Sequence, residues 1–142
     1  MYFRQMKYND FKEFGLLTDY TNSVKNSMIS PLPGFENYKK IYNNLEKNVV
    51  GIDTVEGTRV KGKSKHFMEC VIGIICDPRT GKSRSGVSVG DILELLINPV
   101  KADAIRTGKN VQRTQKDVSE NATVTINPDT GILIQCNSTD SD

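Results

Sequence analysis

The segment ATVTINPDTGI, residues 122–132, carries the strongest local signal in the chain. Apolar and hydroxyl side chains alternate over residues 122–126, and this two-residue period is typical of a half-buried strand. Asn127 begins a turn, the proline after it restricts φ, and Gly131 supplies the positive φ that a bulged hairpin requires. With a second strand predicted over residues 132–137, the sequence indicates an antiparallel hairpin here.

Two more strands are predicted directly before this hairpin, over residues 102–107 and 111–117, with Gly108-Lys109-Asn110 as the turn between them. Successive side chains of a strand point to opposite faces of the sheet. One face of the second strand is therefore predicted to carry Gln112, Thr114 and Lys116, and the other Val111, Arg113 and Gln115.

The residues before these strands have the spacing of helices. Apolar side chains recur every three to four residues in three segments, and Ser88 with Asp91 forms a capping box at the start of a fourth. Asn98-Pro99 ends this last helix, because a residue before proline disfavours the helical conformation. The predicted helices cover residues 10–20, 35–47, 64–75 and 88–98.

Helices followed by strands predict an α+β fold, in which N-terminal helices pack on a twisted antiparallel sheet of about four strands. A chain of 142 residues with 37% hydrophobic and 25% charged residues suits one compact globular unit. We expect residues 1–58 to be an N-terminal helical or linker region that derives from a parent protein. Residues 59–142 are expected to form the functional domain.

The sequence disfavours several classes of protein. No apolar run approaches the roughly 18–20 residues that span a bilayer. The N-terminus does not resemble a signal peptide, so export is expected to depend on a larger parent protein. A single histidine and no CxxC pair argue against a zinc site, and no metal or other cofactor is predicted. Rossmann GxGxxG, HxxH and HNH patterns are also absent from the sequence.

The three cysteines are predicted to be buried and to behave as small apolar residues. They are Cys70, Cys76 and Cys136, and an odd number without a repeated spacing is a poor disulfide framework. A bridge from Cys70 to Cys76, or from one of them to Cys136, is the alternative.

The net charge of +2 hides an uneven distribution. Residues 1–58 are neutral, whereas residues 59–116 hold twelve basic and five acidic side chains. Residues 117–142 hold five acidic side chains and no basic one. A basic middle block suits a phosphate-rich partner, and a solvated lysine-rich face is the alternative.

His66 is the first candidate functional residue, because it is the only side chain here that titrates near neutrality without help. Lys63 and Lys65 precede it, and Arg84 follows in a basic loop. An ordinary surface or core histidine is the alternative. Further candidates lie on the predicted strands, where a solvated outer face is the alternative, and in Asn137-Ser138-Thr139, where the alternative is a polar tail.

These residue types suffice to cleave RNA without a metal. A base takes the proton of the ribose 2′-OH, so that this oxygen attacks the adjacent phosphorus. Cations and hydroxyls stabilise the charge that builds on the phosphoryl oxygens, and an acid protonates the leaving oxygen. DNA lacks the 2′-OH, so this chemistry is specific for RNA.

Three segments together resemble a known family: SKHFMECVIG at residues 64–73, GVSVGDI at residues 86–92 and ATVTINPDTG at residues 122–131. They are similar to the C-terminal toxin modules of bacterial polymorphic toxins (contact-dependent inhibition, WapA and LXG types), in the barnase/EndoU/colicin/RelE-like (BECR) ribonuclease superfamily. The resemblance implies a metal-independent RNase that often acts on tRNA. It also implies delivery from a secreted parent toxin into the cytoplasm of a target cell, and a cognate immunity protein.

By position, the resemblance implies catalytic roles for His66, Thr114 and Thr139. Charge and placement add Arg106 and Lys116 as catalytic candidates. Cys70 stands where relatives often have arginine, and Ser138 where they often have proline. Substrate contacts are expected from Lys63, Lys65, Arg84, Gln112 and Asn137.

The leading hypothesis is therefore an RNase toxin that leaves a cyclic phosphate. A non-catalytic module that binds nucleic acid or protein is the first alternative, and a DNase toxin is the second. The immunity protein is expected to be acidic where it covers the basic block at residues 61–84, because a toxin must be silenced where it is made.

Overall fold

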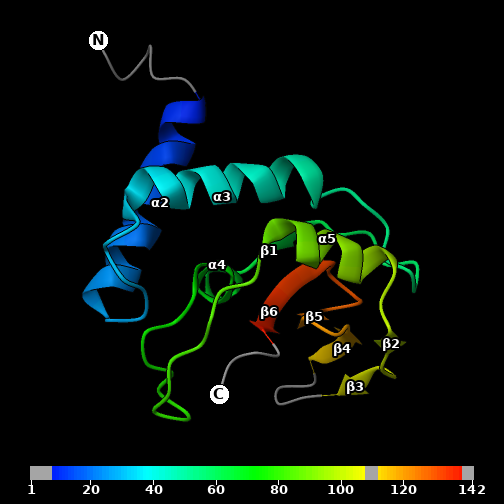
Figure 1. Cartoon of the computed structure of the whole chain (residues 1–142). Helices are drawn as coiled ribbons and strands as arrows, with labels where there is room; N and C mark the ends of the chain where they lie inside the picture. Colours follow the sequence, from blue (N-terminus) through cyan, green and yellow to red (C-terminus); the bar gives the residue numbers. More distant parts are fainter. Residues whose placement is uncertain (1–7, 108–111, 139–142) are drawn as a thin grey trace.

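The computed structural model describes residues 8–107 and 112–138, and it has the predicted α+β architecture. The helices gather on one side of the strand layer (Figure 1). The predicted turn at residues 108–110 lies outside the described residues. The helices are α2 (Tyr8–Lys25), α3 (Gly34–Asn48), α4 (Lys65–Ile72) and α5 (Val89–Ile97). The strands are β1 (Gly62–Lys63), β2 (Lys101–Ala102), β3 (Arg106–Thr107), β4 (Arg113–Val118), β5 (Ala122–Ile126) and β6 (Ile132–Ser138).

The described sheet has six strands rather than about four, and it is mixed rather than purely antiparallel. Its order is β1-β6-β5-β4-β2, with β3 also paired to β4. The mixed character comes from β1, which runs parallel to β6 with Gly62 beside Ile132. The predicted strand at residues 102–107 is divided into β2 and β3. Ala102 pairs with Asp117 and Arg106 with Thr114, so this segment holds one residue more than its partner and the ladder is interrupted.

The helices follow the predicted pattern with shifted ends. Helix α3 agrees with the prediction within a residue, and α2 is longer at both ends than predicted. Helix α5 begins as predicted, because the Ser88 hydroxyl accepts the backbone N–H of Asp91 at 3.1 Å. Helix α4 ends at Ile72 instead of residue 75, since Gly73 takes a φ of 112° and Ile74 pairs with Arg84.

The sheet has a buried face and an open face. Helices α4 and α5 pack on the face to which Val124, Leu133 and Cys136 belong, and all three side chains are buried in the core. Leu16 and Leu45 belong to the same core cluster, so the core extends across the expected boundary at residue 58, which stays a prediction. Within residues 8–107 and 112–138, no helix is long and apolar enough to cross a bilayer.

The hairpin between β5 and β6 forms as predicted. The side-chain oxygen of the buried Asn127 accepts the backbone N–H groups of Asp129 and Thr130, at 2.8 and 3.1 Å. Gly131 has a φ of 75°, and a Cβ there would lie 2.3 Å from the carbonyl oxygen of Arg59. Glycine is thus required twice, by the turn and by the segment that leads into β1.

Candidate functional site

A cavity on the open face of the sheet brings together three predicted catalytic residues. Arg106 pairs with Thr114, and Lys116 lies two residues further along the same face of β4. This cavity, called the sheet cavity below, has a volume of about 310 Å³. The prediction that Thr114 and Lys116 share a face is confirmed. The remaining lining residues are Asp103, Ala104, Thr125, Ile134 and Gln135.

A second cavity, called the loop cavity below, lies between the basic loop and the end of β6. It has a volume of about 380 Å³ and contains two predicted substrate residues, Arg84 and Asn137. Its other lining residues are Asp77, Arg79, Thr80, Lys82, Ser83 and Ser138. Gln135 in the sheet cavity and Asn137 in the loop cavity are alternate residues of β6, so they lie on the same face of this strand.

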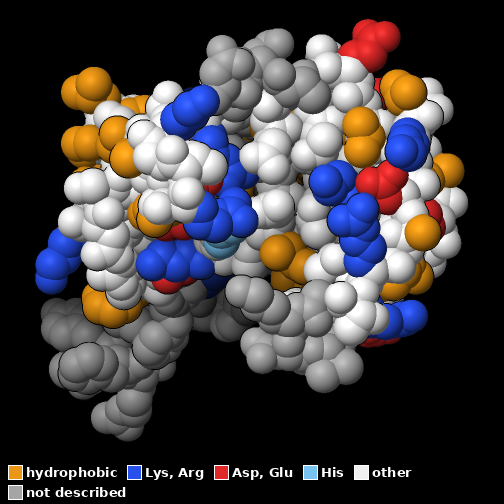
Figure 2. Space-filling model, turned by 90° about the horizontal axis from the view of Figure 1, so that it is seen from below, with side chains coloured by type: hydrophobic (Ala, Val, Ile, Leu, Met, Phe, Trp, Pro, Cys, Tyr) orange, Lys and Arg blue, Asp and Glu red, His pale blue; other side chains and the backbone are white. Residues whose placement is uncertain are grey.

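Lysine and arginine side chains gather around this open face. Figure 2 looks at the molecule from below and shows the histidine, the only one in the chain, within a hollow and beside several of these cations. Another group of cations lies across the hollow (Figure 2). His66 lines neither cavity, and its side chain is 40% exposed. The face therefore presents positive charge on both sides of the hollow.

His66 is held by two partners on its own helix. Its Nδ1 lies 3.4 Å from Oε1 of Glu69, and its Nε2 lies 3.5 Å from Sγ of Cys70. Glu69 is itself fixed, because its Oε2 accepts the Ser23 hydroxyl of α2 at 2.7 Å. The spacings of three and four residues place all three side chains on one face of α4.

The electrostatics of this group favour a charged histidine. Hydrogen bonds to Cys70 and to Glu69 raise the pKa of His66 to about 9. Hydrogen bonds from the Cys136 thiol and from His66 hold the pKa of Cys70 below its usual value, against the effect of burial. The neighbouring Cys70 and burial raise the pKa of Cys136. Both shifts favour an imidazolium at His66 and a thiolate at Cys70.

Arg84 is buried and acts inside this network. Its Nη2 donates to the carbonyl oxygen of Cys136 at 2.7 Å and lies 3.4 Å from Sγ of Cys70, and its Nη1 lies 3.2 Å from Oδ2 of Asp77. The guanidinium thus joins β6, α4 and the basic loop. Arg84 was predicted to contact substrate, and its buried hydrogen bonds give it a structural role.

The remaining predicted residues lie in different places. Lys63 faces α3, where its Nζ lies 3.2 Å from Glu46 and 3.6 Å from the ring centre of Tyr42, and only 2% of its side chain is exposed. Burial lowers its pKa. The arrangement keeps Lys63 away from the open face, whereas Lys65 and Gln112 are exposed. Thr139 lies outside the described residues.

The cysteines differ from the prediction at one position. Cys70 and Cys136 are buried as expected, but Cys76 is exposed, because it lies after the end of α4 at the start of the basic loop. All three are free, so the alternative of a disulfide is not seen. Over the described ranges, no three His, Cys, Asp or Glu side chains are grouped to hold a metal ion.

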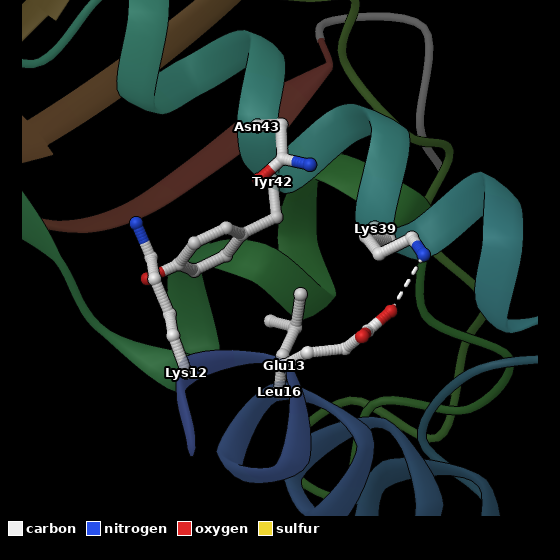
Figure 3. A pocket seen from close by; sticks show the side chains of 6 residues that line it. All are labelled: Lys12, Glu13, Leu16, Lys39, Tyr42 and Asn43. Atoms are coloured by element: carbon white, nitrogen blue, oxygen red, sulfur yellow. Dashed lines mark hydrogen bonds and ion pairs between the residues drawn. The ribbon is translucent and has the colours of Figure 1, made fainter. Parts of the chain in front are cut away.

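A further cavity of about 350 Å³ lies between α2 and α3 (Figure 3). The Lys39 ammonium crosses one side of it and donates to Oε1 of Glu13 at 2.6 Å. Tyr42 points into the space from α3, and Lys12 lies with its Nζ 5.6 Å from the ring centre. The first contact is an ion pair and the second a cation–π contact within the helical layer, and no residue of the predicted site lines this cavity.

The charged state of His66 can be measured directly, because it is the only histidine. We expect Cys70→Ala to lower the pKa of His66 by about one unit or more toward 6.5, since the thiolate partner is lost. Titration of the ring protons by NMR reads this value. Cys76→Ser, at an exposed position, should leave it unchanged. Identical titration curves for wild type and Cys70→Ala would show that the thiolate does not hold the proton.

Comparison with known proteins found no match to any protein-family model, curated protein or solved structure.

Proposed function

We propose that this domain binds RNA across the open face and cleaves it as a metal-independent endoribonuclease of the toxin type. One observation carries the proposal: Arg106, Thr114 and Lys116 line a single cavity on that face. Two cations and a hydroxyl around a cavity are suited to a phosphodiester and to the charge that develops on it during transfer. The hollow beside His66 on the same side of the molecule provides room for a longer strand (Figure 2).

The cleavage step follows from these groups. The ribose 2′-oxygen loses its proton to water and attacks the adjacent phosphorus, while the bond from phosphorus to the 5′-oxygen breaks. Arg106 and Lys116 stabilise the phosphoryl oxygens. The imidazolium of His66, whose pKa is raised to about 9, suits a general acid; because it does not line the sheet cavity, it would protonate the leaving 5′-oxygen through an intervening water. The products are a 2′,3′-cyclic phosphate and a free 5′-hydroxyl.

The test compares RNA cleavage by purified wild type and by Arg106→Ala/Lys116→Ala. We expect wild type to cut tRNA into discrete fragments in the presence of EDTA. The double variant should cut it at least about 100-fold more slowly. His66→Ala should also lose activity. Lys40→Ala/Lys47→Ala removes the same charge from the exposed surface of α3 and should cut like wild type. Intact RNA with wild type would rule out the nuclease.

A non-catalytic RNA-binding module is the second candidate function. It is favoured by one observation: both ring nitrogens of His66 already have partners, Glu69 and Cys70. A histidine held in this way can serve as a fixed positive charge without transferring protons. This function predicts salt-dependent binding of RNA that remains uncut after prolonged incubation.

The biological setting belongs to the same proposal. A module of this kind is carried by a larger secreted toxin, acts in the cytoplasm of the target cell and is inhibited by a cognate immunity protein. The cationic open face supports an inhibitor with an acidic surface, because opposite charges speed association and fix its orientation. An inhibitor that leaves the open face uncovered would contradict this.

A further inference from the structure

We infer that the loop cavity binds a second phosphate of the same RNA strand, so that the substrate is an unpaired strand long enough to reach both cavities. This inference rests on the proposed function, because it extends the binding surface of that site. It assigns Arg79 and Lys82 as phosphate contacts and gives the domain a preference for longer strands.

The loop cavity has cations that its own backbone holds in place. The loop closes through Asp77, whose backbone N–H donates to the carbonyl oxygen of Lys82 at 2.7 Å and whose carboxylate accepts the backbone N–H of Arg79 at 2.9 Å. The Arg79 side chain is 70% exposed, with its Nε 3.7 Å from Oδ1 of Asp77, and the Lys82 side chain is also exposed. The loop is therefore ordered, while its two cations face solvent at the cavity.

The two cavities are joined by one face of the sheet. Gln135 and Asn137 are two residues apart on β6, about 7 Å along the strand. Their partners on β5 are Thr125 and Thr123, which lie on the same face. A continuous surface of amides and hydroxyls thus links the cations of the sheet cavity to Arg79 and Lys82.

The chemistry of this surface indicates an unpaired strand. Residues 101–142 contain no aromatic side chain, so these strands supply no rings on which bases stack. The amides and hydroxyls between the cavities instead suit hydrogen bonds to base edges, which are accessible when bases are not paired. Phosphates at both ends of such a segment would supply most of the affinity.

The experiment measures binding of fluorescent 2′-O-methyl RNA of two, four and eight nucleotides, which cannot react through the 2′-oxygen. Affinity of the wild-type chain should rise with length. Arg79→Ala/Lys82→Ala should bind the dinucleotide like wild type and the octamer about 10-fold more weakly. The slope of log affinity against log salt should fall by about 1.4, at about 0.7 for each lost phosphate contact of a single strand. Lys40→Ala/Lys47→Ala serves as the charge-matched control and should behave like wild type.

The outcomes separate this inference from the proposed function. If wild type cleaves RNA but Arg79→Ala/Lys82→Ala keeps the wild-type length dependence and salt slope, the inference is wrong and the nuclease proposal stands. If wild type cleaves no RNA but the double variant loses the length dependence, the second site stands without the nuclease. Wild-type binding that does not depend on length overturns the inference.

Discussion

Replacement of Arg84 by methionine is expected to lower the free energy of unfolding by about 3–5 kcal/mol. The substitution keeps most of the side-chain volume but removes the donors that satisfy the Cys136 carbonyl and the Asp77 carboxylate. Asp77 then keeps only the backbone N–H of Arg79 and that residue's exposed guanidinium as partners, so its buried carboxylate retains its desolvation cost and loses part of the attraction that offset it. The change would be measured as a shift of the urea midpoint, with the slope of the transition checked for two-state behaviour.

A second substitution tests the cause. Arg84→Met/Asp77→Asn removes both charges and should recover part of the loss, because no ionised carboxylate is left buried. Arg59→Ala breaks an exposed ion pair with Asp53 and should leave the urea midpoint nearly unchanged. If Arg59→Ala lowered the urea midpoint as much as Arg84→Met, the effect of Arg84→Met could not be attributed to the burial of its ion pair.

The second large effect is expected at a pair of buried carboxyl groups. Asp117 of β4 is 1% exposed, and within residues 8–107 and 112–138 no group hydrogen-bonds to its carboxylate oxygens or to those of Glu56. Burial first, then Glu56 and Asp103, raise the pKa of Asp117 from 3.8 to about 8. A proton on Asp117 supplies the donor that the pair lacks, so the raised pKa favours a protonated Asp117 in the folded state at neutral pH.

The sign of the pH effect follows from this proton. A group whose pKa is raised in the folded state makes its full contribution to the free energy of unfolding below about pH 4. This contribution is lost as the pH rises toward 8. Asp117→Asn carries its donor at every pH. Its free energy of unfolding relative to wild type should therefore increase by on the order of 1 kcal/mol for each pH unit between about 5 and 8.

Urea unfolding of both proteins across this pH range measures the difference in their free energies of unfolding. The contributions of the other titrating groups are the same in both proteins and cancel in this difference. Glu56→Gln should show the same trend, because its amide also donates within the pair. Asp53→Asn, an exposed carboxylate, is the control and should follow wild type at every pH. Parallel curves for Asp117→Asn and wild type would show that Asp117 is ionised in the folded protein.

Local patterns in the sequence predicted most elements of the fold. The capped start of α5 and the turn after β5 depend on residues within five positions of each other, so their signals lie in short segments. Strand β1 was not predicted, because it has only two residues and its pairing with Ile132 joins parts of the chain 70 residues apart. The division between β2 and β3 was not predicted for a similar reason, since it depends on the pairing register of this segment against β4.

The site was predictable where strand alternation determines it. Arg106, Thr114 and Lys116 meet in one cavity, because strand pairing and alternation put them on one face. Thr125 shows the same alternation and was not singled out. Lys63 follows no such rule, because its orientation is set by Glu46 and Tyr42 of α3. The lowered pKa of Cys70 beside His66 depends first on Cys136, which no local pattern connects to α4.

The place of β6 in the sheet affects how the protein assembles. This strand is the last described element, yet it lies between β1 and β5, and α4 packs on it. Contacts between distant segments slow folding, because the loop between them must close before they form. A chain on which β6 has not yet docked exposes the edges of two strands and the apolar face of α4. Such an intermediate is prone to pair with other copies, so aggregation during refolding should be greatest before this strand docks.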